Sequence, residues 1–273
     1  MRDYSYRGCL QGVVLDWSGT TVDYGCIAPA QVFVEVFSAR GVPVTLDEAR
    51  SPMGMTKRDH IRAVLHLPRV AEVWQTVHGQ APDEAVLDAL YADFVPRQMQ
   101  TIIQYSDLIP GVVETIAALR VRDLKIGSCT GYSRAMMDAL APIAARAGYV
   151  ADCIITPDDV PYGRPTPFMI YANALRLGIY PLQAIVKVGD TVVDIEEGRN
   201  AGCWTVGLAL TGNEIGLSQA EWAALPPREA RARLEAARHR LHEAGAHYVI
   251  DSLSDVLPVI DAINARLSDG ERP

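Results

Sequence analysis

The sequence contains no long hydrophobic run. No apolar stretch approaches the roughly 18 residues that a membrane-spanning helix needs. Residues 1–11 also lack the apolar segment and small-residue cleavage site of a secretory signal peptide. We therefore expect a protein that makes no contact with a membrane and acts in the cytoplasm.

Cysteine is scarce and follows no recognisable pattern. The cysteines are odd in number, widely spaced and include no C-x-x-C pair; they are Cys9, Cys26, Cys129, Cys153 and Cys203. Disulfide frameworks use even sets of cysteines, and zinc sites use closely spaced pairs. Neither is expected here, and reduced thiols agree with a cytoplasmic enzyme.

The chain also has fewer positively charged than negatively charged residues. Lys and Arg number 25 against 33 Asp and Glu, so the formal net charge is −8. This balance disfavours a broad basic surface for nucleic acid. Neither G-x-x-x-x-G-K-[ST] nor a strand-linked G-x-G-x-x-G occurs, so nucleotide binding has no support. An anionic ligand must be held by local cations, helix N-termini or a metal ion.

The residues that are present favour a folded protein of two parts. The 273 residues are 49% hydrophobic and 21% charged, a balance typical of a well-buried core. The length exceeds the roughly 100–200 residues of one ordinary domain. We expect either two lobes or one lobe that carries a large insertion.

Short apolar runs alternate with helical patterns along most of the chain. The runs cover residues 12–15, 124–129, 153–156, 184–188, 204–208 and 248–250. Helical apolar spacing lies between the later runs, at residues 112–119, 136–140, 169–177 and 228–243. The alternation predicts an α/β fold with a Rossmann-like, mostly parallel sheet and helices on both faces.

Residues 28–105 interrupt this alternation with a purely helical pattern. Its signals are two i,i+4 pairs, a capping box and a further helix start: Val32/Val36, Phe33/Phe37, Thr45 to Glu48, and Thr56. The two apolar pairs serve either the core of this segment or a contact with a second copy. We predict a helical cap domain at residues 28–105, inserted into an α/β core domain of residues 1–27 and 106–273.

Polar clusters follow three of the predicted strands, and a cation lies nearby. They are Asp16 with Ser18 and Thr20, Thr130 with Gly131 and Tyr132, Asp190 with Thr191 and Asp194, and the loop residue Arg164. Carboxyl ends of parallel strands share one sheet edge, so these side chains should meet. Carboxylates, a hydroxyl and a cation suit a magnesium ion and a phosphoryl group, with Asp16 as both metal ligand and nucleophile. A lone loop aspartate is more often a helix cap, but three clusters favour a site.

Four motifs in this order resemble those of the haloacid dehalogenase superfamily: Asp16-x-Ser18-Gly19-Thr20, Thr130, Arg164, and Gly189-Asp190-Thr191-x-x-Asp194. The resemblance implies the same fold. Phosphatases of that superfamily carry a second aspartate two positions after the nucleophile, which protonates the leaving group. Ser18 replaces it here, which disfavours ordinary phosphate-ester hydrolysis.

The predicted cap offers a different catalytic group. Lys57 and His60 lie at i,i+3 on the first turn of a helix that Thr56 caps. The positive helix end disfavours an ammonium group and so favours the free amine. Most lysines are simply exposed side chains, but a free amine can condense with a carbonyl group.

The chain resembles the phosphonoacetaldehyde hydrolase family over nearly its whole length. The matching segments are residues 16–26, 52–54 with Lys57 and His60, 130–132, 156–160 and 188–191. Ser18 stands where that family commonly has Ala. This change should be tolerated, because the position contributes its backbone carbonyl to magnesium in the family.

The resemblance implies a function and a set of site residues. A small phosphonate aldehyde forms a Schiff base with Lys57, Asp16 accepts the phosphoryl group, and His60 relays protons. Asp16, the Ser18 carbonyl and Asp190 hold Mg²⁺, while Asp194 orients its neighbours. Substrate contacts are implied for Thr130, Arg164, Met53, Gly54, Tyr132 and Cys26. A homodimer through cap helices is also implied.

Two other functions stay open at this point. A magnesium-dependent phosphatase acting on a small phosphate ester would use the same core motifs without an amine. A non-catalytic binding protein on this scaffold is the other alternative, and it conflicts with the presence of both Asp16 and Asp190.

Overall fold

Six parallel strands form one sheet in the computed structural model, which describes residues 6–273. The strands are β1 (Gly12–Leu15), β2 (Lys125–Cys129), β3 (Cys153–Ile155), β4 (Ile185–Gly189), β5 (Trp204–Leu208) and β6 (Tyr248–Ile250). Their order is β3-β2-β1-β4-β5-β6, and every neighbouring pair is parallel. The predicted α/β fold is confirmed, and the sheet is parallel throughout rather than mostly.

Side chains alternate between the two faces of the sheet, and helices cover both. Val13 and Leu15 join a core cluster with residues of the covering helices α6 and α12, while Val14 joins another with residues of α8. These helices and their neighbours are α6 (Val112–Val121), α7 (Arg134–Arg146), α8 (Phe168–Leu177), α9 (Val192–Ala201), α10 (Gln219–Ala224), α11 (Pro227–Glu243) and α12 (Val256–Ser268). Successive side chains of a strand point to opposite faces of the sheet. Because helices cover both faces, nearly every residue of a strand is buried and must be apolar.

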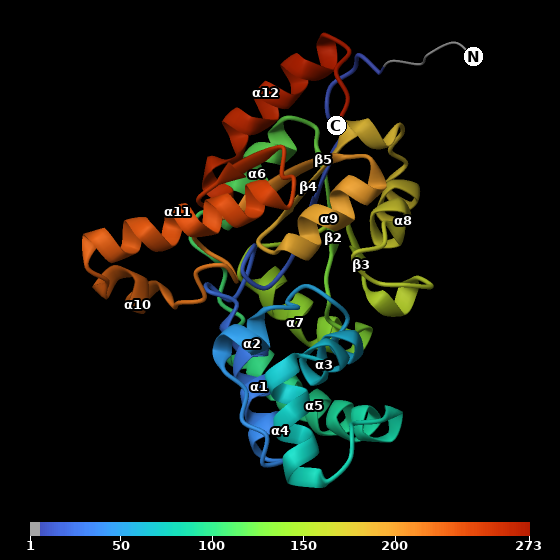
Figure 1. Ribbon diagram of the computed structural model, residues 1–273. Coiled ribbons are helices and arrows are strands. Elements are labelled where there is room, and N and C mark those ends of the chain that lie inside the picture. Colours follow the sequence, from blue (N-terminus) through green and yellow to red (C-terminus); the bar gives the residue numbers. More distant parts are fainter. Residues whose placement is uncertain (1–5) are drawn as a thin grey trace.

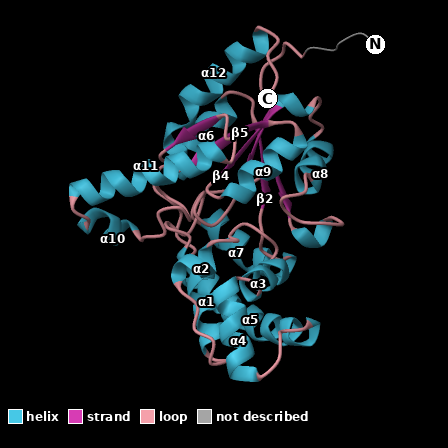
Figure 2. Ribbon diagram, viewed as in Figure 1, coloured by secondary structure: helices cyan, strands magenta, loops and turns pink. Residues whose placement is uncertain are grey.

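A purely helical group lies at one end of the molecule, beyond the sheet (Figures 1 and 2). It consists of α1 (Ile27–Ser38), α2 (Leu46–Arg50), α3 (Lys57–Leu65), α4 (Pro68–His78) and α5 (Glu84–Gln104). The capping box at Thr45 and the Thr56 cap are both present. The sequence pattern did not identify α4.

The apolar pairs of α1 belong to the core of this chain. Val32, Phe33, Val36 and Phe37 are all buried, and α1 packs along α5. The sequence left open whether these residues form the core of the helical group or a contact with a second copy. Their burial within one chain assigns them to the core. A contact with a second copy would need other residues.

The strand order places the site between the sheet and the helical group. The order reverses between β1 and β4, and ligands of open parallel sheets bind at such a switch point, beyond the carboxyl strand ends. Asp16 and Asp190 follow these two strands directly. The chain leaves β1 for the helical group and returns through α6, so α1 to α5 lie over that end of the sheet (Figure 1).

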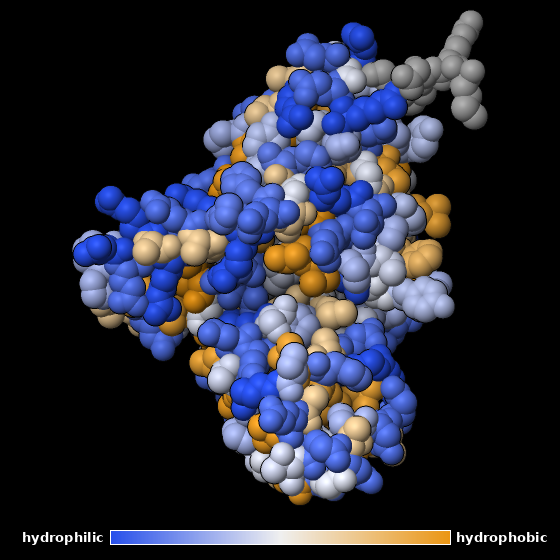
Figure 3. Space-filling view, in the orientation of Figure 1, coloured by the Kyte–Doolittle hydropathy of each residue, from blue (hydrophilic) through white to orange (hydrophobic). Residues whose placement is uncertain are grey.

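Hydrophilic residues cover most of the face in Figure 3, and apolar residues form small separate patches on it. Among residues 6–273, no helix is both long and apolar enough to cross a membrane.

Candidate active site

One cavity brings together most of the predicted site residues. It is lined by Asp16, Ser18, Cys26, Pro29, Met53, Gly54, Lys57, Thr130, Gly131, Tyr132, Arg164 and Thr191. The lining comes from strand ends of the sheet and from the helical group together. Four of the predicted site residues are not part of this lining: Thr20, His60, Asp190 and Asp194.

Asp16 is held by Arg164 at the floor of the cavity. The Asp16 backbone N–H donates to the Val188 carbonyl, and Arg164 Nη2 lies 2.8 Å from Asp16 Oδ1. Burial and the negative charge of Asp194 raise the pKa of Asp16, although Arg164 opposes the shift. A buried carboxylate of this kind is available as a nucleophile once further positive charge is nearby.

Arg164 is fixed before any ligand binds. Its side chain is almost fully buried, its Nη1 lies 3.0 Å from Asp194 Oδ1, and its Nε donates to Glu197 Oε2 at 2.9 Å. A guanidinium held on several sides keeps a single orientation. It therefore presents a preorganised positive charge beside Asp16, as binding of a phosphoryl group requires.

Asp190 does not line the cavity, but it lies close to Asp16 and is tightly held. It accepts hydrogen bonds from Thr20 Oγ1 at 3.0 Å and from the Asn213 backbone N–H at 2.8 Å. A Cβ at Gly19 or Gly212 would come within 2.3 or 2.1 Å of the Asp190 side chain, so only glycine fits at these positions. Burial and the charge of Asp16 raise the pKa of Asp190 well above its usual value.

Three carboxylates converge in a way that suits a divalent cation. Asp16, Asp190 and Asp194 offer oxygen atoms within 4.8 Å of one another, and all three are buried. Carboxylate and carbonyl oxygens are the ligands that Mg²⁺ prefers. Burial first, and neighbouring carboxylates second, raise the pKa values of Asp16 and Asp190, and a bound cation would favour the ionised form of both. The donor set therefore fits magnesium.

Asp194 has other partners. Lys187 Nζ donates to its Oδ1 at 2.6 Å, and Thr191 Oγ1 donates to its Oδ2 at 2.6 Å. Burial alone would raise the pKa of Asp194, but Arg164 and Lys187 outweigh burial and lower it. These contacts agree with the expected orienting role of Asp194.

Lys57 reaches the cavity from the first turn of α3. Its Nζ lies 4.9 Å from the centre of the Tyr132 ring and 6.0 Å from that of Phe33. Burial lowers the pKa of Lys57 to about 8, against the opposing negative charge of Asp16. The sequence predicted a lowered value from the helix N-terminus, whereas burial is the largest cause. With a pKa of about 8, Lys57 is mostly protonated at pH 7, and the free amine becomes the major form above about pH 8.

A second polar cluster lies around Ser18. The Ser18 hydroxyl donates to Asp23 Oδ2 at 2.5 Å, and Asp23 also accepts the backbone N–H groups of Ile27 and Ala28 at the start of α1. Burial raises the pKa of Asp23 to about 6 and that of Cys26 well above its usual value. The Ser18 hydroxyl is engaged with Asp23, and the metal-ligand role of the Ser18 backbone carbonyl stays a prediction.

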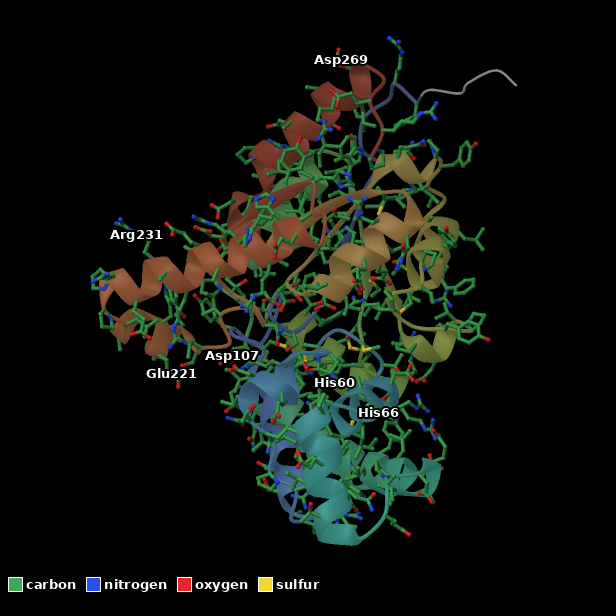
Figure 4. The ribbon with its side chains drawn as sticks, in the orientation of Figure 1. His60, His66, Asp107, Glu221, Arg231 and Asp269 are labelled. Carbon is green, nitrogen blue, oxygen red and sulfur yellow. The ribbon has the colours of Figure 1, made fainter. Side chains whose placement is uncertain are left out.

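His60 lies behind Lys57 in the helical group. Its Nε2 is 2.7 Å from the Ala49 carbonyl, and its ring stacks on Phe33 with centroids 3.7 Å apart. Burial, and then the charge of Lys57, lower the pKa of His60 well below its usual value, so the ring is neutral. Figure 4 labels His60 where the helical group meets the rest of the molecule. It does not line the cavity, and its predicted relay role stays a prediction.

Comparisons with known proteins agree with this arrangement. The family model of haloacid dehalogenase-like hydrolases matches residues 10–202. A phosphonoacetaldehyde hydrolase of Nitratidesulfovibrio vulgaris is 50% identical and covers 100% of this chain and 98% of its own length. Another, from Paraburkholderia xenovorans, is 48% identical over 97% of this chain and 99% of its own. The chain belongs to the phosphonoacetaldehyde hydrolase family, within the haloacid dehalogenase-like hydrolases.

A solved structure extends the likeness to three dimensions. The crystal structure of a phosphonoacetaldehyde hydrolase-like protein from Oleispira antarctica matches with a TM-score of 0.97 and 41% identity. The match covers 100% of this chain and 99% of that one. The likeness therefore includes both the sheet and the helical group.

Sequence reasoning missed two charged residues that hold this family member's site together. Lys187 and Glu197 are fully buried; Lys187 pairs with Asp194, and Glu197 accepts from Arg164. One signal was available, because Lys187 is a charged residue within the apolar run at 184–188. A lysine there needs a buried anion as partner. Glu197 gave no comparable signal, since a glutamate on a helix is ordinarily exposed.

Proposed function

We propose that this protein hydrolyses the carbon–phosphorus bond of phosphonoacetaldehyde and releases acetaldehyde and phosphate. One observation supports this above all: the Lys57 amine and the Asp16 carboxylate line the same cavity, next to Arg164. An ordinary phosphatase needs the carboxylate and the cation but has no use for a buried amine.

Lys57 makes the carbon a leaving group. Its free amine adds to the aldehyde and loses water, which gives a protonated imine. When the carbon–phosphorus bond breaks, its electron pair enters the imine and forms an enamine instead of an unstabilised carbanion. Protonation of the enamine carbon and addition of water then release acetaldehyde and regenerate the amine. Tyr132 and Met53 line the cavity around this group.

Asp16 accepts the phosphoryl group. Its carboxylate oxygen attacks phosphorus as the enamine departs and forms an aspartyl phosphate, which water cleaves to phosphate. Arg164 and the Thr130 hydroxyl stabilise the negative phosphoryl oxygens. Gly54 and Cys26 line the cavity around the reacting groups, and His60, which lies outside the lining, is the proposed proton relay.

Magnesium completes the site in this proposal. Asp16, the Ser18 carbonyl and Asp190 would hold it, while Asp194 keeps Arg164 and Lys187 in place. When bound, the ion offsets negative charge between the carboxylate and the phosphoryl group.

We propose that residues 28–105 act as a cap domain over the core of residues 1–27 and 106–273. The cap delivers Lys57 and excludes water from the imine. A homodimer and a cytoplasmic location stay predictions for this protein.

The decisive test is release of both products from phosphonoacetaldehyde, with and without metal. With Mg²⁺ we expect acetaldehyde and phosphate in equal amounts, and after chelation a loss of phosphate release that added Mg²⁺ restores. A set of small phosphate esters is the control. Turnover of the esters with none of phosphonoacetaldehyde would select the phosphatase instead, and no turnover of any substrate would favour a binding protein.

The lowered pKa of Lys57 predicts how the rate depends on pH. Only the unprotonated amine can attack the aldehyde, and its fraction rises as the pH passes through about 8. Below that value the rate of imine formation should rise about tenfold per pH unit and then level off above it. The measurement is the rate of borohydride-trapped adduct with acetaldehyde between pH 6 and 9. A rate that does not change with pH would contradict the assignment.

A further inference from the structure

Arg50 joins three separate parts of the molecule. It is the last residue of α2 in the helical group, and only 8% of its surface is exposed. Its Nη1 donates to the carbonyls of Gly25 and Cys26 at 3.0 and 3.1 Å and to Asn213 Oδ1 at 3.2 Å, and its Nη2 donates to the Gly216 carbonyl at 3.1 Å. All four acceptors are uncharged oxygens. A planar guanidinium can reach such divergent acceptors together, which an ammonium cannot.

The first pair of acceptors lies in the linker between β1 and α1. Asp23, Gly25 and Cys26 have left-handed backbone conformations, with φ of 58°, 89° and 51°. Two of these are not glycine, so the bend is strained and persists only if its surroundings hold it. Asp23 holds the bend from one side through the start of α1, and Arg50 holds it from the other through the two carbonyls.

The second pair of acceptors lies in a rigid core loop. Glu214 pairs with Arg240 of α11 at 2.5 Å, and the Asn213 backbone N–H donates to Asp190. A Cβ at Gly216 would come within 2.7 Å of Arg50 Nε, so the guanidinium lies directly against this loop. Arg50 thereby connects α2 to the same loop that holds Asp190.

The chain immediately after Arg50 carries Met53, Gly54 and Lys57 into the cavity. This segment touches the core closely: a Cβ on Gly54 would meet Thr191 Oγ1 at 2.6 Å, and a Cβ on Gly131 would meet the Met55 carbonyl at 2.5 Å. The segment packs against the core with no room for added atoms. Because it follows α2 directly in the chain, a small rotation of α2 would disturb this packing. Arg50 fixes α2 at the point where this segment begins.

We propose that Arg50 is a positioning residue that locks the helical group onto the core and so sets Lys57 opposite Asp16. The lock is built from Arg50, the bend at residues 23–26 and the loop at residues 213–216. The kinetic part of this inference rests on the proposed function, whereas its structural part does not.

Hydrogen–deuterium exchange without substrate tests the structural part. In Arg50→Met we expect the amides of residues 23–27 and 51–56 to exchange about 10–100-fold faster, while those of β1 and β4 stay protected. Asn213→Ala removes one acceptor but keeps the backbone bond to Asp190, and should give a smaller effect in the same segments. Arg40→Met is the matched control, because Arg40 pairs with Asp93 of α5 at the surface of the helical group and not with a residue of α2. Unchanged exchange in Arg50→Met, or faster exchange that includes β1 and β4 equally, would overturn the proposal.

Trapping kinetics test the positioning itself. With acetaldehyde and borohydride, Arg50→Met should form the Lys57 adduct about 10–100-fold more slowly, yet in the same final amount. If part of the variant were misfolded, the final amount of Lys57 adduct would fall, while the folded fraction would react at the wild-type rate. That result would contradict a positioning role for Arg50. Arg50→Lys should recover part of the rate, because its single nitrogen reaches only some of the acceptors. If the wild-type protein does not cleave phosphonoacetaldehyde, the proposed function fails. The exchange result still decides whether Arg50 holds the helical group on the core.

Discussion

Replacing Lys57 by arginine is expected to lower turnover of phosphonoacetaldehyde by at least about 10⁴-fold and to abolish covalent trapping. Arginine keeps the positive charge and most of the length, but its guanidinium is not deprotonated in proteins and does not condense with an aldehyde. The variant therefore separates the need for charge from the need for a nucleophilic amine. Acetaldehyde release and mass spectrometry after borohydride treatment measure the two effects.

The lysine content of the chain makes this test unusually clean. The sequence contains three lysines: Lys57, Lys125 and Lys187. Lys187 is ion-paired with Asp194 in the core. Burial would lower its pKa, but the negative charges of Asp194 and Glu197 outweigh burial and raise it. Lys125 is exposed at the start of β2. Lys125→Arg is the matched control and should retain full activity. An adduct on Lys125 or Lys187, or turnover retained in Lys57→Arg, would refute the imine mechanism.

The sequence predicted the sheet and the strand-end residues because both depend on local pattern. Each of the six strands is a short apolar run, and the strand ends of a parallel sheet share one edge. The meeting of Asp16, Thr130 and Asp190 followed from that geometry. The helices α9 and α12 were not identified. In α9, Asp194 and Glu197 are buried beside Ile195, so polar and apolar residues do not separate onto two faces.

The supporting charges could not be predicted because each depends on a partner distant in sequence. Glu197 is buried only because Arg164 and Lys187 lie beside it in the fold. Arg50 ends a short helix whose sequence suggests an exposed surface, and its acceptors come from residues 25–26 and 213–216. A single sequence does not show such pairings. The lowered pKa of Lys57 was predicted in the right direction, but burial in the assembled cavity is its main cause.

Asp16→Asn should stop the reaction one step later than Lys57→Arg does. Asparagine is nearly isosteric but is not a nucleophile toward phosphorus, so phosphate release should fall by at least about 10⁴-fold. The fold should be preserved, since Arg164 keeps its contacts with Asp194 and Glu197. Imine formation should also be preserved. The charge of Asp16 raises the pKa of Lys57, and its removal favours the free amine.

The chemical identity of the trapped adduct distinguishes the two steps. Wild-type protein treated with phosphonoacetaldehyde and borohydride should carry an ethyl group on Lys57, because the carbon–phosphorus bond has been cut before reduction. Asp16→Asn should instead carry a phosphonoethyl group on the same lysine, because the imine forms and the bond stays intact. Asp138→Asn, at an exposed aspartate of α7, is the control and should give the ethyl adduct. An ethyl adduct in Asp16→Asn would show that the bond breaks without this carboxylate. The absence of any adduct would show that Asp16 is already needed for the imine. The first result would remove Asp16 from the role of phosphoryl acceptor, and the second would contradict the predicted order, in which Lys57 forms the imine without Asp16.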